Sequence, residues 1–388
     1  MRFYIMKKDA PGALISISPE EKICVIENIN KNNLPFCLHG DKLTSENIQL
    51  WIQKRSLSIG RTNSDRLLKI AECQSNFMLS VKNKCLTLSD CFWLKEENEQ
   101  TNWENVNFFD NTYADNVGNI LIKNAEETFS LSPDVCTNGI MDKAWRKREG
   151  RDVLFKLGKA PFYQEPVNEV ICSQIAGLFP NLNPVKYFLT NIDGSNCSIC
   201  KNFMTQDTEF IPAYQIYDKK DNIYNDVYYT LVQECKKLGM LYIKKFLDEM
   251  ITFDYLICNT DRHLGNFGFL RDVNTGEFLG PAPLFDNGSS LWFDEDIDIM
   301  TGTGEISKPF AKSFKEQLEY IGSLPIIHKE DFLGKEQRLY ETMSEFFTKE
   351  RAERITELFN IRSKNVLKMI EKHHKKEFMH YKNTEKER

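Results

Sequence analysis

The sequence predicts an α+β protein in which a strand-rich region precedes a long helical region. Three observations carry this prediction. Residues 116–218 contain short apolar runs bounded by turn residues, which is the pattern of strands, with one helical segment among them. Residues 219–388 have apolar residues at helical spacing over most of their length. Residues 1–115 contain short elements of their own, so we expect a separate N-terminal subdomain there.

The first region predicts a small subdomain with two short helices. Ser45 begins a segment in which apolar residues recur three to four positions apart, the pattern of a capped amphipathic helix. Residues 64–70 predict a second helix, and short apolar runs follow at 76–81 and 91–94. None of these segments has the spacing of a catalytic motif.

The second region predicts strands around a single helix. Residues 119–122 and 152–157 are apolar runs that predict two strands. Residues 185–190 and 198–203 flank a turn and predict an antiparallel pair. The apolar residues of 166–178 repeat at helical spacing and predict the helix.

The third region is predicted to be mainly helical. We expect a helix over 240–257, a hairpin formed by 267–270 and 277–279, and further helices over 310–321, 329–347 and 351–371. The charged tail from Lys372 onward is expected to fray.

Composition argues against two classes of partner. Apolar residues make up 41% and charged residues 27% of the chain, as in ordinary globular proteins. The net charge of −6 argues against a broad nucleic-acid-binding surface. No segment approaches the ~18 consecutive apolar residues that a membrane helix needs. We therefore expect no membrane association and no direct nucleic-acid binding.

The eleven cysteines mostly occur in apolar contexts, which predicts reduced, buried thiols in a cytoplasmic protein. Cys197 and Cys200 form a lone C-x-x-C pair, and a zinc site would need two further ligands. No matching pair follows. Two small residues beside a strand are the simpler interpretation, with a metal or redox role as the alternative.

The strongest functional pattern joins two segments, NTDRHLGN at 259–266 and LFDNG at 284–288. Phosphoryl transfer needs a carboxylate facing the acceptor hydroxyl, and oxygen ligands that hold Mg²⁺ on the ATP phosphates. Asp261 is the candidate catalytic carboxylate, and Asn266 and Asp286 are the candidate metal ligands. The alternative is an ordinary turn, because Asp and Asn are frequent turn residues.

Residues upstream supply candidates for binding the phosphates. Lys156 lies among apolar residues in a predicted strand, and Glu169 on the next helix is a candidate partner for it. The loop 132–139 precedes this strand, where a phosphate-covering loop belongs, but it contains only Gly139. A plain surface loop is the equal alternative. His263 is better interpreted as bracing the catalytic loop than as a base.

These segments resemble the HipA-like serine/threonine kinases. NTDRHLGN resembles the catalytic loop of that family, N-T-D-R-H-x-x-N, and PLFDNGSSL at 283–291 resembles its metal-binding segment. EPVNEV at 165–170 and S-x-C-x-N-F at 198–203 are similar to small-lobe elements of a divergent subgroup. The resemblance extends over roughly 118–370. It implies a two-lobed protein-kinase-like fold with a small β-rich lobe, a helical C-terminal lobe and an N-terminal accessory subdomain.

The resemblance also implies roles for particular residues. It implies that Asp261 is catalytic, that Asn266 and Asp286 bind Mg²⁺, and that Lys156 contacts ATP. The adenine-contacting hinge falls on backbone groups of Lys201, Asn202 and Phe203. In the family a serine of a Gly- and Ala-rich phosphate loop can be autophosphorylated. This chain departs from that loop, and Ser132 or Thr137 stands closest to the role.

We therefore expect a cytoplasmic kinase that transfers the ATP γ-phosphoryl group to a protein serine or threonine with the help of Mg²⁺. Many relatives are toxins paired with a DNA-binding antitoxin, so the resemblance implies such a partner too. Two other classes stay open. One is a small-molecule phosphotransferase of the antibiotic-kinase kind, which shares D-x-x-x-x-N and a later Asp. The other is a non-catalytic partner that holds an antitoxin or operator complex, against which the intact Asp261, Asn266 and Asp286 argue.

Overall fold

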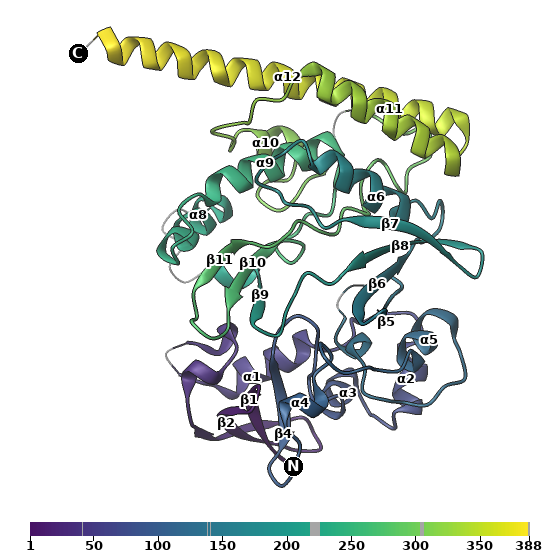
Figure 1. The fold of residues 1–388 in the computed structure, drawn as a ribbon, viewed down its shortest axis with the longest axis vertical. Coiled ribbons are helices and arrows are strands. Elements are labelled where there is room, and N and C mark those ends of the chain that lie inside the picture. The colour runs from purple at the N-terminus through teal and green to yellow at the C-terminus, as the bar shows by residue number, and fades with distance from the viewer. Residues whose placement is uncertain (41, 138, 140, 218–225, 303–305, 387–388) are drawn as a thin grey trace. The chain divides into compact units, whose positions relative to one another are not determined.

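The computed structural model describes the chain except residues 41, 138, 140, 218–225, 303–305 and 387–388, with side chains given as far as His374 (Figure 1). The chain forms two compact units. Unit 1 comprises Met1–Leu157, Ile199–Ile211 and Leu270–Glu277. Unit 2 comprises Gly158–Ser198, Pro212–Phe269 and Phe278–Arg388. The boundaries expected from the sequence at residues 115 and 218 stay predictions.

The N-terminal part of unit 1 is a four-stranded antiparallel sheet with short helices. The strand order is β3-β2-β1-β4, with β1 at Arg2–Lys7, β2 at Ala10–Ile17, β3 at Ile23–Asn28 and β4 at Phe92–Glu96. The helices are α1 at Ser45–Lys54, α2 at Ser64–Ile70, α3 at Asn76–Lys82 and α4 at Trp103–Val106. Ile5, Ile15 and Trp93 are fully buried in the core of this part. The two predicted helices are confirmed, and the cap of α1 is Thr44, which accepts the Asn47 N–H.

The strand predicted at 119–122 is wrong. These residues lie in helix α5, Asn116–Lys123, whose buried residues include Val117, Ile120 and Leu121. Their spacing of three and one is that of a helix face. A run of four apolar residues is too short for its periodicity to separate strand from helix. In the folded protein this helix face packs into a second hydrophobic cluster of unit 1, and this tertiary packing favours the helix.

Two further sheets contain the strands predicted at 152–157, 185–190, 198–203, 267–270 and 277–279, together with two strands that were not predicted, Lys143–Arg148 and Thr208–Pro212. One has the order β5-β6-β8-β7, with β5 at Lys143–Arg148, β6 at Arg151–Leu157, β7 at Tyr187–Ile192 and β8 at Ser195–Lys201. The other has the order β11-β10-β9, with β9 at Thr208–Pro212, β10 at Gly268–Asp272 and β11 at Phe278–Pro281. The strand at 152–157 and both predicted hairpins are confirmed.

Unit 2 contains the helices predicted at 166–178, 240–257, 310–321, 329–347 and 351–371, and two further helices, Ala213–Ile216 and Val227–Lys237, that were not predicted individually. In chain order they are α6 at Glu165–Ala176, α7 at Ala213–Ile216, α8 at Val227–Lys237, α9 at Ile243–Leu256, α10 at Phe314–Leu318, α11 at Lys329–Phe346 and α12 at Lys349–Lys386. Helix α10 is shorter than predicted. Helix α12 packs against α11 and continues through the charged tail that was expected to fray (Figure 1). Within the described part of the chain, no helix has the length and apolar character required to cross a bilayer.

Candidate active site

The catalytic-loop candidate follows the end of α9 and is built around a buried ion pair. Arg262 is fully buried, and its Nε and Nη2 atoms donate to the carboxylate of Asp254, in the last turns of α9, at 3.0 to 3.2 Å. Asn259 Nδ2 donates to the same carboxylate at 3.0 Å. Burial alone would lower the pKa of the Arg262 guanidinium, but the charge and hydrogen bonds of Asp254, together with the charges of Asp286 and Glu169, outweigh burial, and the pKa is raised. Arg262 therefore remains a cation inside the protein.

The guanidinium of Arg262 also joins the two segments that carry the predicted metal ligands. Its Nη1 atom donates to the carbonyl of Asn266 at 3.0 Å and to the carbonyl of Phe285 at 2.6 Å. Its Nη2 atom donates to Asn287 Oδ1 at 2.6 Å. One rigid planar group, with its donors in a fixed geometry, thus holds the catalytic loop beside the segment that contains Asp286.

Sequence reasoning missed Asp254, Asn259 and Arg262 as residues of this site. The available signal was the carboxylate of Asp254 within the apolar run 250–258, because a buried carboxylate requires a partner.

The carboxylate of Asp261 is exposed at the surface of this loop. Its side chain is 45% exposed, and the ammonium of Lys308 lies 2.8 Å from Oδ1. The backbone of Asp261 is held on both sides: its N–H donates to Asn259 Oδ1, and its carbonyl accepts from Asn266 Nδ2. The Gly265 N–H donates to Nδ1 of His263 at 3.0 Å, which confirms the bracing role predicted for this histidine.

Asn266 and Asp286 present the kinds of atom that Mg²⁺ takes. Because Asn266 Nδ2 donates to a carbonyl, Oδ1 is the atom of this amide suited to a cation. Asp286 has a backbone φ of 63°, in the left-handed region that side chains other than glycine rarely adopt. Such strain is commonly kept at functional sites. One amide oxygen and one carboxylate fit an ion that takes its remaining ligands from water and phosphates.

Helix α6 supports the segment that follows Asp286. Asn168 Nδ2 donates to the carbonyls of Gly288 and Ser290 at 2.9 and 2.6 Å. Glu169, fully buried, accepts the N–H of Asn287 at 2.8 Å. A Cβ atom on Gly288 would lie 3.1 Å from Cβ of Glu165, so only glycine fits there without displacing a neighbour. The E-P-x-N-E run therefore positions the metal-ligand candidate through backbone contacts.

The remaining candidates lie in unit 1. Lys156 is 4% exposed on β6, opposite Lys143 in the β5–β6 register. Asn202 donates its N–H to the carbonyl of Asp152 at 2.9 Å and its Nδ2 to the carbonyl of Leu88 at 3.1 Å.

Among the other hinge candidates, Lys201 is exposed at the end of β8, and the ring of Phe203 packs edge-on against Phe210. Gly139 has a φ of 91°, and its N–H donates to Ser58 Oγ. The structure thus brings Asp261, Asn266, Asp286 and Glu169 together in unit 2. The pairing of Lys156 with Glu169 stays a prediction.

The two hydroxyls considered for autophosphorylation are buried in unit 1. Ser132 caps the short 3₁₀ helix η3, Pro133–Cys136, by accepting the Asp134 N–H at 3.2 Å. Thr137 is 8% exposed and donates to the carbonyl of Asp134 at 2.7 Å. Both hydroxyls are therefore part of the packing of this segment, while Asn138 lies outside the described residues.

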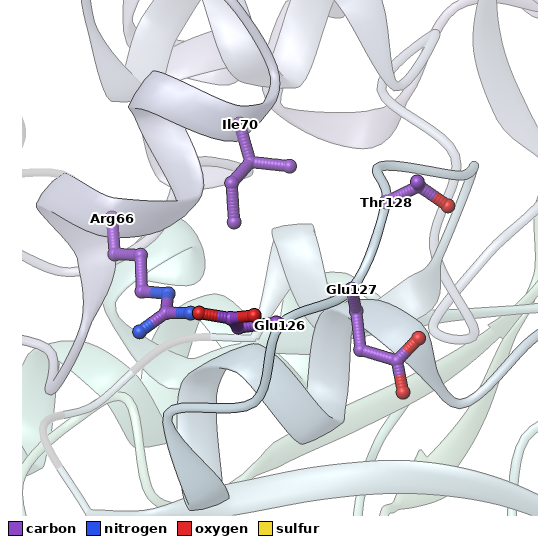
Figure 2. A pocket seen from close by; sticks show the side chains of 5 residues that line it. All are labelled: Arg66, Ile70, Glu126, Glu127 and Thr128. Atoms are coloured by element: carbon purple, nitrogen blue, oxygen red, sulfur yellow. The ribbon is translucent and has the colours of Figure 1, made fainter.

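Two other features of the described residues do not join the site. Cys197 and Cys200 are buried in β8, and no cluster of three or more His, Cys, Asp or Glu side chains is suited to a metal in the described part. An open hollow of about 400 Å³ lies in unit 1. Figure 2 shows the side chains that line it, those of Arg66, Ile70, Glu126, Glu127 and Thr128. None of these five residues is a candidate for phosphoryl transfer.

Comparison with known proteins gives matches to kinases. No protein-family model matches the sequence. A segment of 105 residues, 25% of this chain, is 34% identical to the serine/threonine-protein kinase CtkA of Helicobacter pylori and covers 32% of it. The match therefore spans about a third of that relative.

Among solved structures, HipA in the complex of HipA, HipB and operator DNA from Shewanella oneidensis MR-1 covers 96% of this chain and 99% of its own, with 12% identity and a TM-score of 0.54. The structure of H. pylori CtkA covers 60% of this chain and 93% of its own, with 18% identity and a TM-score of 0.41. The predicted resemblance to HipA-like kinases and the kinase-like fold are confirmed.

Proposed function

We propose that this chain, which has the fold of the HipA-like kinases, is an ATP- and Mg²⁺-dependent serine/threonine protein kinase. The observation that carries the proposal is the buried Arg262 guanidinium, whose Nη1 atom binds both the carbonyl of Asn266 and the carbonyl that precedes Asp286. Phosphoryl transfer depends mainly on positioning charged groups against one another. A single buried cation supplies that positioning here, next to the exposed carboxylate of Asp261.

In this proposal, Asp261 orients the hydroxyl of the acceptor and takes its proton. Asn266 and Asp286 hold Mg²⁺, which neutralises charge on the ATP phosphates. Lys156 contacts the phosphates, with Glu169 as its partner. The remaining nucleotide contacts are assigned to the loop that contains Gly139 and to the hinge backbone at Lys201, Asn202 and Phe203.

The acceptor in this proposal is a serine or threonine of another protein in the cytoplasm. A DNA-binding antitoxin is the proposed regulatory partner. It is supported by the occurrence of HipA in a complex with HipB and operator DNA, since HipA shares the fold of this chain.

The test is a transfer assay with γ-labelled ATP, Mg²⁺ and a cell lysate, followed by phosphoamino-acid analysis. We expect label on protein serine or threonine. Asp261→Asn should reduce transfer by at least ~10², the lower end of the general-base contribution, while still binding Mg·ATP. Label found only on small molecules would instead make the chain a small-molecule phosphotransferase. Full transfer by Asp261→Asn would remove Asp261 from the mechanism.

A further inference from the structure

Lys308 contacts the candidate catalytic carboxylate from a distant part of the sequence. Its Nζ atom lies 2.8 Å from Oδ1 of Asp261, although 46 residues separate the two positions. Among the residues that the structure describes, none donates to the other carboxylate oxygen, Oδ2. The side chains of Lys308 and Asp261 are 48% and 45% exposed, so the pair lies at the surface.

The segment that carries Lys308 is held by one buried glutamine. Gln317, on α10, is 1% exposed, and its Nε2 donates to Ser307 Oγ and to the carbonyl of Lys308. Its Oε1 accepts the N–H of Phe310 at 3.2 Å. One side chain thus holds the segment from Ser307 to Phe310 through the Ser307 hydroxyl and two backbone groups, the Lys308 carbonyl and the Phe310 N–H.

Two other contacts complete the support of this segment. The Ser307 N–H donates to the carbonyl of Lys312 at 3.0 Å, and Ile306 forms a β-bridge with Ser313, which is the capping residue of α10. Phe310 is buried among the aromatic rings of Tyr228, Phe267 and Tyr320. The backbone of Lys308 therefore lies in a loop that is held in place by hydrogen bonds and by aromatic packing.

Stability does not account for this contact. Ion pairs between exposed side chains contribute about 0 to 1 kcal/mol, because water screens the attraction and both side chains lose freedom. A buried glutamine that makes three hydrogen bonds to this segment is not explained by an ion pair that contributes so little to stability. Placing a cation on one oxygen of a catalytic carboxylate is a better reason for it.

We propose that Lys308 is a positioning residue for phosphoryl transfer, which holds Oδ1 of Asp261 so that Oδ2 faces the acceptor hydroxyl. The inference rests on the proposed kinase function. In the transfer step, the hydroxyl proton moves to Oδ2 and the hydroxyl oxygen bonds to the γ-phosphorus of ATP. The bond from that phosphorus to the bridging oxygen breaks, and ADP leaves with the electron pair. Lys308 neither gives nor takes a proton.

The test compares the steady-state kinetics of the full chain with those of Lys308→Ala, Lys308→Gln and Lys308→Arg. We expect both neutral variants to lower kcat roughly tenfold or more, as misplacing a reacting group does, with KM for ATP changed less than about twofold. Lys308→Arg should recover part of kcat. Lys312→Ala is the matched control, because Lys312 is exposed on the same segment and should retain wild-type kcat.

A double-mutant cycle shows whether Lys308 acts through Asp261. In the Asp261→Asn background, Lys308→Ala should cause no further loss of kcat. An additional tenfold loss there, or an unchanged kcat of Lys308→Ala and Lys308→Gln beside an active wild type, would overturn the inference alone. A wild-type chain that transfers phosphate to no protein would overturn the proposed kinase function and the inference with it. Melting temperatures of the variants should match that of the wild type.

Discussion

At the scale of single residues, Arg262 decides the geometry of the candidate site. Its five N–H groups donate to Asp254, to Asn287 and to the carbonyls of Asn266 and Phe285. A single side chain therefore connects α9, the catalytic loop and the segment that contains Asp286. Lysine would supply the charge without the planar set of donors, so it could not replace these contacts. Because the pair is buried, removing one partner leaves an uncompensated charge inside the protein.

Arg262→Met should therefore lower the free energy of unfolding by about 3 to 5 kcal/mol, the usual cost of leaving a buried charge unpaired. The measurement is urea unfolding. Arg338→Met is the matched control in the same unit, because that side chain is 58% exposed in a loose pair with Glu341 and should cost less than about 0.5 kcal/mol. Equal losses in the two variants would contradict the structural role of Arg262.

Asp286 is predicted to bind the metal directly. Mg·ATP should raise the melting temperature of the wild type, since a ligand that binds only the folded state stabilises it by mass action. Asp286→Ala should abolish most of this rise and leave the melting temperature without ligand nearly unchanged. Asp298→Ala, at an exposed acidic position of the same unit, should keep the rise. An undiminished shift in Asp286→Ala would exclude it as a metal ligand.

At the scale of elements, short segments are held by buried polar side chains. Helix α6 supports the segment after Asp286 through Asn168 and Glu169. In unit 1, Asp134 connects η3 to β5. Its carboxylate accepts the Trp145 N–H at 2.7 Å, and its Oδ2 lies 3.7 Å from Nη1 of Arg146. Burial raises the pKa of Asp134 to about 6, against the opposing effects of the Trp145 N–H and Arg146.

The raised pKa of Asp134 predicts a pH dependence of stability. Between its ordinary value of 3.8 and about 6, the folded state binds more protons at this group than the unfolded state. The contribution of Asp134 to stability therefore falls as the pH rises through this range. Asp134→Asn removes the effect, so its unfolding free energy relative to wild type should rise by up to about 3 kcal/mol between pH 4 and pH 7. Urea unfolding at both pH values measures it, and a constant difference would contradict the assignment.

The burial of Ser132 and Thr137 argues against autophosphorylation at either residue. A phosphate on either hydroxyl would add a charge of about −2 in a buried place beside Asp134, and would break a hydrogen bond of η3. We therefore expect peptide mass spectrometry after incubation with Mg·ATP to find no phosphate on either residue while a foreign protein is labelled. The Asp261→Asn chain is the control. Phosphate on either residue would mean that η3 opens in the native protein.

At the scale of the whole molecule, the candidate residues follow the division into units. The acceptor-orienting and metal-binding candidates, together with Glu169, lie in unit 2. Lys156, Gly139 and the hinge residues lie in unit 1. The fold as a whole is kinase-like, with 12% identity to HipA over almost the full chain. At that identity the likeness is one of fold.

The sequence by itself determined the elements whose pattern is local. Strand β6, helices α6 and α9, and the D-x-x-x-x-N loop were predicted because periodicity and motif spacing are properties of neighbouring residues. Only the tertiary structure decided α5, the Arg262 network, the burial of Ser132, and the contact of Lys308 with Asp261. Each of these depends on residues far apart in the chain, whose approach is set by packing and by the need of buried polar groups for partners.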